Sequence, residues 1–209
     1  MLFPGIPLPL HIFEPRYRMM INECLAADAP FGVVLIRRGV EAGGPVAEPY
    51  PVGCSARILE SETLPDGRIS ITAVGGERFR ILALDHSRTY LQGEVEAYPL
   101  DETGLPHARA GADATLSRTV RRYLELLRAI TGASFEYEDV LLPIEPLLLM
   151  YFSAAILQIP APEKQPMLAA ASAGSLLDML NRVYSREIGV LSRTSKISPR
   201  AAEKLARLN

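Results

Sequence analysis

The chain has 209 residues, enough for one large domain or two small ones, and its 48% hydrophobic and 22% charged content is ordinary for a globular protein. A formal net charge of −2 gives no electrostatic reason to expect binding to nucleic acid or to an acidic membrane. Cys24 and Cys54 form no C-x-x-C pair, which favours two buried free thiols in a reducing cytoplasm over a disulfide framework. No basic segment with an apolar core opens the chain, and the apolar run 147–157 is shorter than the roughly 20 residues that cross a bilayer. We therefore expect a cytoplasmic protein.

An extended apolar segment turns into an amphipathic helix within residues 8–18. Pro15 suits the first helical position, because its fixed φ matches the helix and its missing N–H would be unpaired there. Glu14 then lies beside the positive end of the helix dipole. Apolar side chains follow at helical spacing and predict one buried face, namely Tyr17, Met20, Ile21, Cys24 and Leu25.

Polar groups crowd this strand-to-helix corner at His11, Glu14, Arg16 and Tyr17. Ion-pair networks often hold such corners without doing chemistry. We interpret the four residues as a structural clasp, and a functional site is the alternative.

Short strands dominate residues 31–98. The apolar run 32–37 predicts one strand, and a loop rich in Gly and Pro follows at 38–51. Alternating runs at 55–62 and 68–74 flank Pro65-Asp66-Gly67 and predict a hairpin. Further strands are predicted at 78–84 and 90–98, with Val74-Gly75-Gly76 as a strand break. Residues 1–102 therefore predict a closed or half-closed β-barrel with one inserted helix.

The pattern changes to the helical period after about residue 103. Helices are predicted over 116–130, ended by Gly132, and over 144–156, 162–171 and 177–188. Residues 103–191 thus form a small α-helical bundle, and the basic tail 192–209 is expected as a short frayed helix or a disordered end. The fold class is α+β.

Several motifs resemble, in the same order, the N-terminal substrate-binding domain of the Lon protease family. The matching stretches are 8–17 (P-L-H-I-F-E-x-R-Y), 31–36, 52–59 (V-G-x-x-A-x-I), the hairpin at 64–68, 76–81 (G-x-x-R-F) and 162–165 (E-K-Q). The resemblance covers residues 2 to 191. It implies a PUA-like β pseudobarrel followed by a helical bundle, and recognition of exposed apolar stretches or partly unfolded chains.

Catalytic machinery is not expected. Full Lon proteases follow this region with an ATPase and a Ser-Lys peptidase, but the sequence has no G-x-x-x-x-G-K-[ST] string that would cradle phosphate. His11, His86 and His107 are scattered without the spacing of metal ligands. We expect a stand-alone, non-enzymatic family member with no catalytic residue, metal site or cofactor.

The predicted function is polypeptide binding at the junction of the barrel and the bundle. Candidate binding residues are Phe13, Tyr17 and Phe31, together with parts of the 38–51 loop. The alternative is a regulatory or adaptor protein that binds a partner protease or a small ligand. RNA binding is less favoured, because the chain lacks a basic stripe with interleaved aromatic residues and has no Trp.

The N-terminal edge of the barrel is expected to be open. Family members usually carry a strand resembling L-P-L-F-P-L before the run that begins here at Leu2, directly after Met1. Pro4, Pro7 and Pro9 limit strand pairing by the N-terminal segment itself, since proline cannot donate a backbone hydrogen bond to a β-ladder. We therefore predict self-association through this edge, or a start codon assigned downstream of the true one.

Overall fold

The computed structural model describes residues 1–40, 47–102, 112–131 and 141–206, and at 112, 113, 131 and 195–206 the backbone alone. It divides into two compact units. Unit 1 comprises Met1–Asp101 and Ala154–Ala171, and unit 2 comprises Glu102–Ser153 and Ser172–Asn209. The described strands lie in unit 1.

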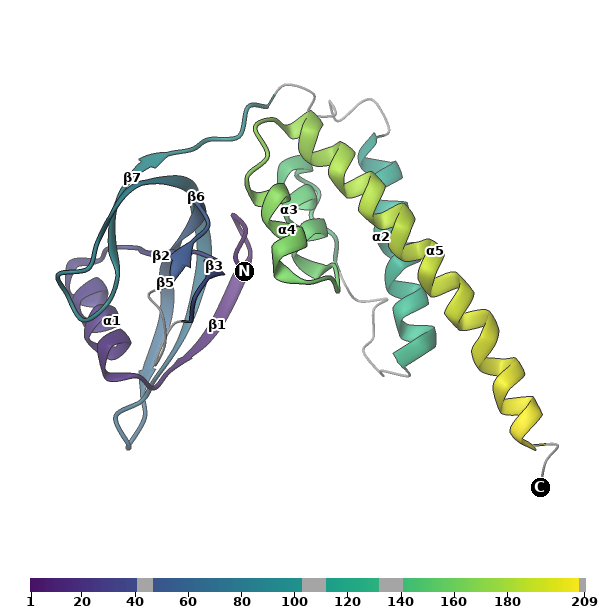
Figure 1. Ribbon diagram of the computed structural model, residues 1–209, viewed down its shortest axis with the longest axis horizontal. Coiled ribbons are helices and arrows are strands. Elements are labelled where there is room, and N and C mark those ends of the chain that lie inside the picture. Colours follow the sequence, from purple (N-terminus) through teal and green to yellow (C-terminus); the bar gives the residue numbers. More distant parts are fainter. Residues whose placement is uncertain (41–46, 103–111, 132–140, 207–209) are drawn as a thin grey trace. The chain divides into compact units, whose positions relative to one another are not determined.

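Unit 1 is built on an antiparallel sheet in which strands follow the order β1-β6-β5-β2, and β7 pairs with the second half of β6 (Figure 1). These strands are β1 (Pro7–Ile12), β2 (Phe31–Val33), β5 (Val52–Thr63), β6 (Ile69–Asp85) and β7 (Gln92–Ala97). The predicted β5–β6 hairpin is confirmed, and Gly67 takes a φ of 79° at its turn. Alternate side chains of the hairpin are buried, namely Val52, Cys54, Ala56, Ile69, Ile71 and Ala73.

The long strand β6 shows that the predicted strand break at Val74-Gly75-Gly76 was wrong. The strand continues through these residues, while its register with β5 shifts between Cys54 and Ala56. The N-terminal segment pairs with β6 here: Gly5 N–H donates to Gly75 O at 2.8 Å, and Gly75 N–H donates to Ile6 O at 3.0 Å. The glycines therefore mark a bulge with a close backbone approach rather than the end of a strand.

The apolar run 32–37, predicted as one strand, is divided between two sheets. β2 pairs with β5, whereas β3 (Ile36–Arg38) pairs with β4 (Glu48–Pro49) in a separate two-stranded sheet. A change of partner within an apolar run leaves no mark on its hydrophobicity, so the sequence pattern could not reveal it. The predicted 38–51 loop contains β4, and residues 41–46 lie outside the described part of the chain.

The main sheet is an open path among the described strands, because β2 pairs only with β5 and β7 only with β6. The mixed α and β content agrees with the predicted class. Closure into a PUA-like pseudobarrel stays a prediction.

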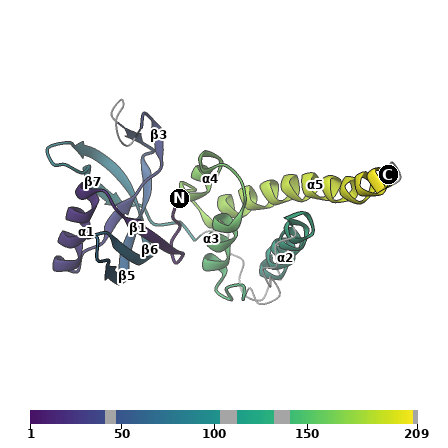
Figure 2. The ribbon, with the colours of Figure 1, turned by 90° about the horizontal axis from the view of Figure 1, so that it is seen from below.

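Helix α1 (Pro15–Ala27) lies beside the sheet in both views (Figure 1, Figure 2). Pro15 occupies its first turn as predicted, and the extended Glu14 accepts a backbone hydrogen bond from Arg18 N–H at 3.0 Å. The predicted buried face is buried at Ile21, but Leu25 is exposed and Met20 and Cys24 border a cavity.

Helix α4 (Ala161–Leu168) is joined to the sheet by two buried polar side chains. The Arg78 guanidinium on β6 donates to Leu168 O at 2.7 Å and to Ala170 O at 2.8 Å, and Gln165 Nε2 donates to Val52 O at 2.9 Å. A cation at the carboxyl end of a helix also interacts favourably with the helix dipole. These bonds explain why 154–171 belongs to unit 1, whereas the predicted division into 1–102 and 103–191 placed it in the helical bundle.

Unit 2 pairs α2 (Ala112–Thr131) with α5 (Ala173–Ala206), which lie side by side in both views (Figure 1, Figure 2). The rings of Tyr123 and Tyr184 meet edge to face at 5.2 Å, and Tyr184 OH donates to Ser153 O in α3 (Pro146–Ile156) at 2.8 Å. The side chains buried in these helices include Leu116, Val120, Tyr123, Leu124, Leu149, Met150, Leu176, Leu180 and Tyr184. The helix predicted over 116–130 is thus confirmed, with an apolar stripe buried at Leu116, Val120, Tyr123 and Leu124, while Gly132 lies outside the described residues.

Helix α5 continues through Ala206, past the predicted boundary at 191/192. Gly189 does not end it, because a glycine within a helix costs only about 1 kcal/mol relative to alanine. None of the helices in the described ranges is long and apolar enough to span a membrane.

Candidate functional site

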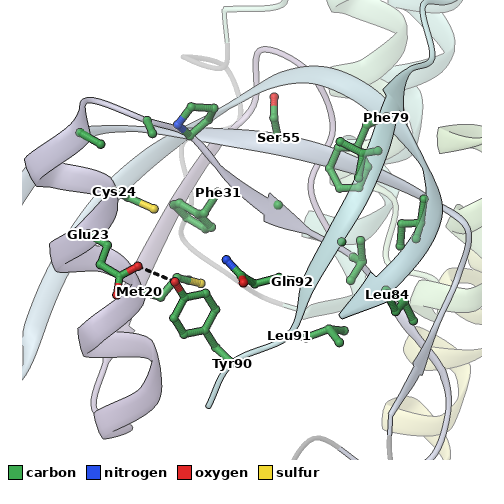
Figure 3. Close-up of a pocket in the computed structure, with 18 residues that line it drawn as sticks. Met20, Glu23, Cys24, Phe31, Ser55, Phe79, Leu84, Tyr90, Leu91 and Gln92 are labelled. Carbon is green, nitrogen blue, oxygen red and sulfur yellow. Dashed lines mark hydrogen bonds between the residues drawn. The ribbon is translucent and has the colours of Figure 1, made fainter. Parts of the chain in front are cut away.

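A cavity of about 510 Å³ opens in unit 1 between α1, β2 and the β6–β7 hairpin (Figure 3). Its volume falls within the range of roughly 300–1,000 Å³ that is usual for binding pockets. Most of its wall is apolar. Its apolar residues include Phe31, Phe79, Leu84, Leu91 and Val95.

Phe79 forms one wall of the cavity and rests on two glycines. A β-carbon at Gly53 would lie 2.6 Å from Phe79 Cζ, and one at Gly32 would lie 3.1 Å from the same atom. Gly32 on β2 and Gly53 on β5 therefore leave the space that the Phe79 ring fills. This packing fixes the ring without any polar contact.

Three large apolar side chains of the cavity remain open to solvent. Leu84 on β6, Leu91 before β7 and Val95 on β7 are 37%, 39% and 48% exposed. Leu84 and Leu91 lie on the same side of the cavity (Figure 3). Neighbouring exposed apolar side chains around a cavity are typical of an interaction surface.

One polar cluster closes the α1 side of the cavity. Tyr90 OH donates to Glu23 Oε2 at 2.6 Å (Figure 3), and Arg88 donates to the same oxygen at 3.0 Å. The hydrogen bond to Glu23 raises the pKa of Tyr90, which favours the protonated phenol that donates this bond. The cluster ties α1 to the segment before β7 and leaves the Glu23 carboxylate paired.

The thiols of unit 1 are poorly suited to nucleophilic chemistry. Burial and the nearby Glu23 carboxylate raise the pKa of Cys24, which lines the cavity. Burial raises the pKa of Cys54 to about 12. Because the thiolate is the reactive form, both side chains behave as small apolar groups at neutral pH.

The structure separates the three predicted polypeptide-binding residues. Phe31 lines the cavity and is buried, Phe13 is 63% exposed and Tyr17 is half-buried. Phe13 and Tyr17 are not among the residues that line the cavity. The predicted surface at the junction of the two halves stays a prediction, since this cavity lies within unit 1.

Three of the four corner residues form a contact chain. Arg16 pairs with Glu14 at 2.9 Å, and its guanidinium lies 4.6 Å from the centre of the Tyr17 ring. His11 Nδ1 instead contacts Ser70 Oγ on β6 at 3.2 Å. His11 thus joins β1 to β6, and the role of the cluster as a clasp stays a prediction.

A second hollow, of about 570 Å³, has a mixed lining in which His11, Glu60 and Glu62 stand beside Leu10 and Ile71. Among the residues whose placement is described, no group of three or more His, Cys, Asp or Glu side chains could hold a metal ion. His107 lies outside the described residues. The first cavity is the stronger candidate site, because large exposed apolar side chains border it and none borders the second hollow among the described residues.

Most of the cavity wall was not predicted from the sequence, although one signal was present. Leu91 and Val95 alternate with polar residues in the predicted strand 90–98, and the apolar face of such a strand is normally covered. In the structure both side chains are substantially exposed. The alternation in 90–98 was therefore the available sign, and the exposure of this apolar face among the described residues is typical of a binding surface.

Comparison with known proteins identifies the family. Residues 1–185 match the family model of the ATP-dependent protease La (LON) substrate-binding domain. The chain belongs to this family. Relatives include Lon protease 1 of Hydrogenovibrio crunogenus, 25% identical over 204 residues, and Lon protease 2 of Myxococcus xanthus, 26% identical over 196 residues. These alignments cover 98% and 93% of this chain but 25% and 23% of the relatives, so the chain spans about a quarter of their length.

Solved structures of Lon N-terminal domains share the fold. A Lon N-terminal domain protein from Xanthomonas campestris superposes with a TM-score of 0.59 at 22% identity, covering 87% of this chain and 91% of that one. The N-terminal domain of the Mycobacterium avium complex Lon protease gives a TM-score of 0.58 at 18% identity, covering 90% and 92%.

Proposed function

We propose that this protein binds extended or partly unfolded polypeptide segments, and that the cavity of unit 1 receives their apolar side chains. The observation that carries the proposal is the exposed apolar rim of Leu84, Leu91 and Val95 around a mostly apolar cavity. Membership in a substrate-binding family supports the same function.

The physical basis is the burial of apolar surface. An unfolded chain exposes the Leu, Val, Ile and Phe side chains that a folded protein hides. Their transfer from water into an apolar pocket contributes about 25 cal/mol per Å². The paired Glu23 carboxylate adds little net charge at the cavity, so uncharged side chains are favoured there.

The test measures binding of a labelled, reduced and carboxymethylated model polypeptide by fluorescence anisotropy. Leu91→Gln places a polar group on the rim and is expected to raise the dissociation constant about tenfold, the effect of losing most of one buried side chain. Leu91 is already exposed, so the substitution should leave the melting temperature nearly unchanged.

Leu82→Gln is the matched control. Leu82 is 55% exposed on β6 and is not among the residues that line the cavity. We expect it to leave binding unchanged. If Leu91→Gln and Leu82→Gln weakened polypeptide binding equally while both proteins stayed folded, the polypeptide would bind outside the cavity.

Three further expectations belong to this proposal. We expect no catalytic step, and the raised thiol pKa values of Cys24 and Cys54 support this. A cytoplasmic location is supported by both cysteines being free. Self-association through the N-terminal edge is supported by β1 having β6 as its one ladder neighbour among the described strands.

A further inference from the structure

We propose that the bound segment adds to the free edge of β7 as a β-strand, with apolar side chains entering the cavity and a basic side chain facing Glu94. This inference rests on the proposed polypeptide binding. It specifies the backbone geometry and the charge pattern of the segment that binds.

Two free strand edges border the cavity. Phe31 and Gly32 of β2 and Gln92, Gly93 and Val95 of β7 contribute to its wall. Among the described strands, β2 pairs with β5 alone and β7 with β6 alone, so each has a side without a ladder partner. The N–H and C=O groups on such a side can pair with an extended peptide, and the neighbouring cavity can hold its alternate side chains.

β7 is the better template of the available edges. It has six residues and no proline, whereas β2 has three residues. β1 carries Pro7 and Pro9, which lack the N–H that a ladder needs. A strand on β7 would therefore form the longer ladder beside the cavity.

The charges on β7 specify what should lie opposite. Val95 lines the cavity, whereas its neighbours Glu94 and Glu96 are exposed and are not among the lining residues. Glu96 pairs with Arg80 at 3.1 Å, but the residue opposite Glu94 on β6 is Ala83. On the added strand, a Lys or Arg facing Glu94 would supply the positive charge that β6 does not.

The predicted occupant is therefore an extended segment in which apolar residues alternate with basic ones. Side chains alternate between the two faces of a strand. The apolar set shares the face of Val95 and enters the cavity, while the basic set shares the face of Glu94. A segment with acidic residues at the alternate positions would meet a like charge at Glu94.

The experiment compares two short labelled peptides by fluorescence anisotropy, one alternating valine with lysine and one alternating valine with glutamate. The lysine peptide is expected to bind more tightly by roughly two- to fivefold, the effect of one favourable cross-strand charge pair. Glu94→Lys should reverse the preference. Asp178→Lys, an equal charge change at an exposed position on α5, should leave it unchanged.

Backbone pairing is tested by N-methylation of the lysine peptide at alternate amides. One alternate set should abolish binding, because those N–H groups face β7, and the other set should retain it. Equal binding of both methylated peptides would overturn strand addition, and a continued effect of Leu91→Gln would show that polypeptide binding itself stands.

Two other results would also overturn the inference. Failure of every peptide and of the unfolded model polypeptide to bind would remove the proposed function as well. Concentration-dependent self-association that Val95→Asp abolishes would place a second copy of this chain on the edge instead.

Discussion

Phe3 is fully buried, and its carbonyl oxygen lies so close to Gly75 that the β-carbon of any other residue at this position would clash with it. That β-carbon would be 2.1 Å from Phe3 O and 2.9 Å from Phe3 C. Both contacts are with backbone, so neither can be relieved by turning a side chain. The close packing of the N-terminal segment against β6 therefore depends on the absence of a β-carbon at position 75.

Gly75→Ala should lower the free energy of unfolding by about 1–3 kcal/mol, the usual cost of forcing extra volume into a packed site. Urea unfolding followed by circular dichroism measures it. Gly189→Ala is the contrasting variant, since a β-carbon there would meet nothing within 4 Å. In the middle of α5 it should raise stability by about 0.5–1 kcal/mol. Similar effects of the two substitutions would contradict the close approach at Gly75.

At the scale of elements, two nearby arginines of β6 make different contacts. Arg78 and Arg80 both lie over the Tyr98 ring, at 4.9 and 4.3 Å from its centre. Arg78 is buried and donates to the two carbonyl oxygens at the end of α4, whereas Arg80 is exposed and pairs with Glu96. The attachment of α4 to the sheet thus depends on Arg78.

Arg78→Met should cost about 2–4 kcal/mol of stability, because charge-assisted hydrogen bonds contribute about 1.5–3 kcal/mol each and the carbonyls of Leu168 and Ala170 would lose their donor. Arg80→Met should cost less than about 1 kcal/mol, as is usual for an exposed ion pair. Thermal melts of both variants provide the comparison. If Arg80→Met lowered stability more than Arg78→Met, the attachment of α4 to the sheet would not depend on the hydrogen bonds of Arg78.

The elements that could be predicted from the sequence are those with a complete local signal. The β5–β6 hairpin has alternating runs around Pro65-Asp66-Gly67, and α2 has an apolar stripe from Leu116 to Leu124. Partner choice is not local. The division of 32–37 between β2 and β3, and the bulge at Gly75, depend on chain segments that are distant in the sequence.

The candidate site was predictable only in part for the same reason. Phe31 could be singled out as an aromatic residue on a predicted strand, and it does line the cavity. Phe79 lines it because Gly32 and Gly53, on two other strands, leave room for its ring. Such a match between three strands appears only when the sheet is assembled.

At the scale of the whole molecule, unit 1 is discontinuous in sequence. Its sheet comes from the first 101 residues, and its buried core also includes Leu157, Met167 and Leu168 from 154–171. The ends of the two segments meet where Asp101 N–H donates to Ala171 O at 3.0 Å. Neither segment therefore holds the complete set of contacts that stabilises unit 1.

A protein shortened to residues 1–102 should consequently lack a cooperative thermal transition, because Arg78 and the buried face of the sheet lose their partners on α4. A synthetic peptide of residues 154–171, added in trans, should restore the transition and bind the fragment with a measurable dissociation constant. The same peptide with Gln165→Ala lacks the hydrogen bond to Val52 O and should bind about five- to tenfold more weakly. A shortened protein that unfolds cooperatively, with the midpoint of the full chain and no response to the peptide, would show that 154–171 is not needed for unit 1 to fold.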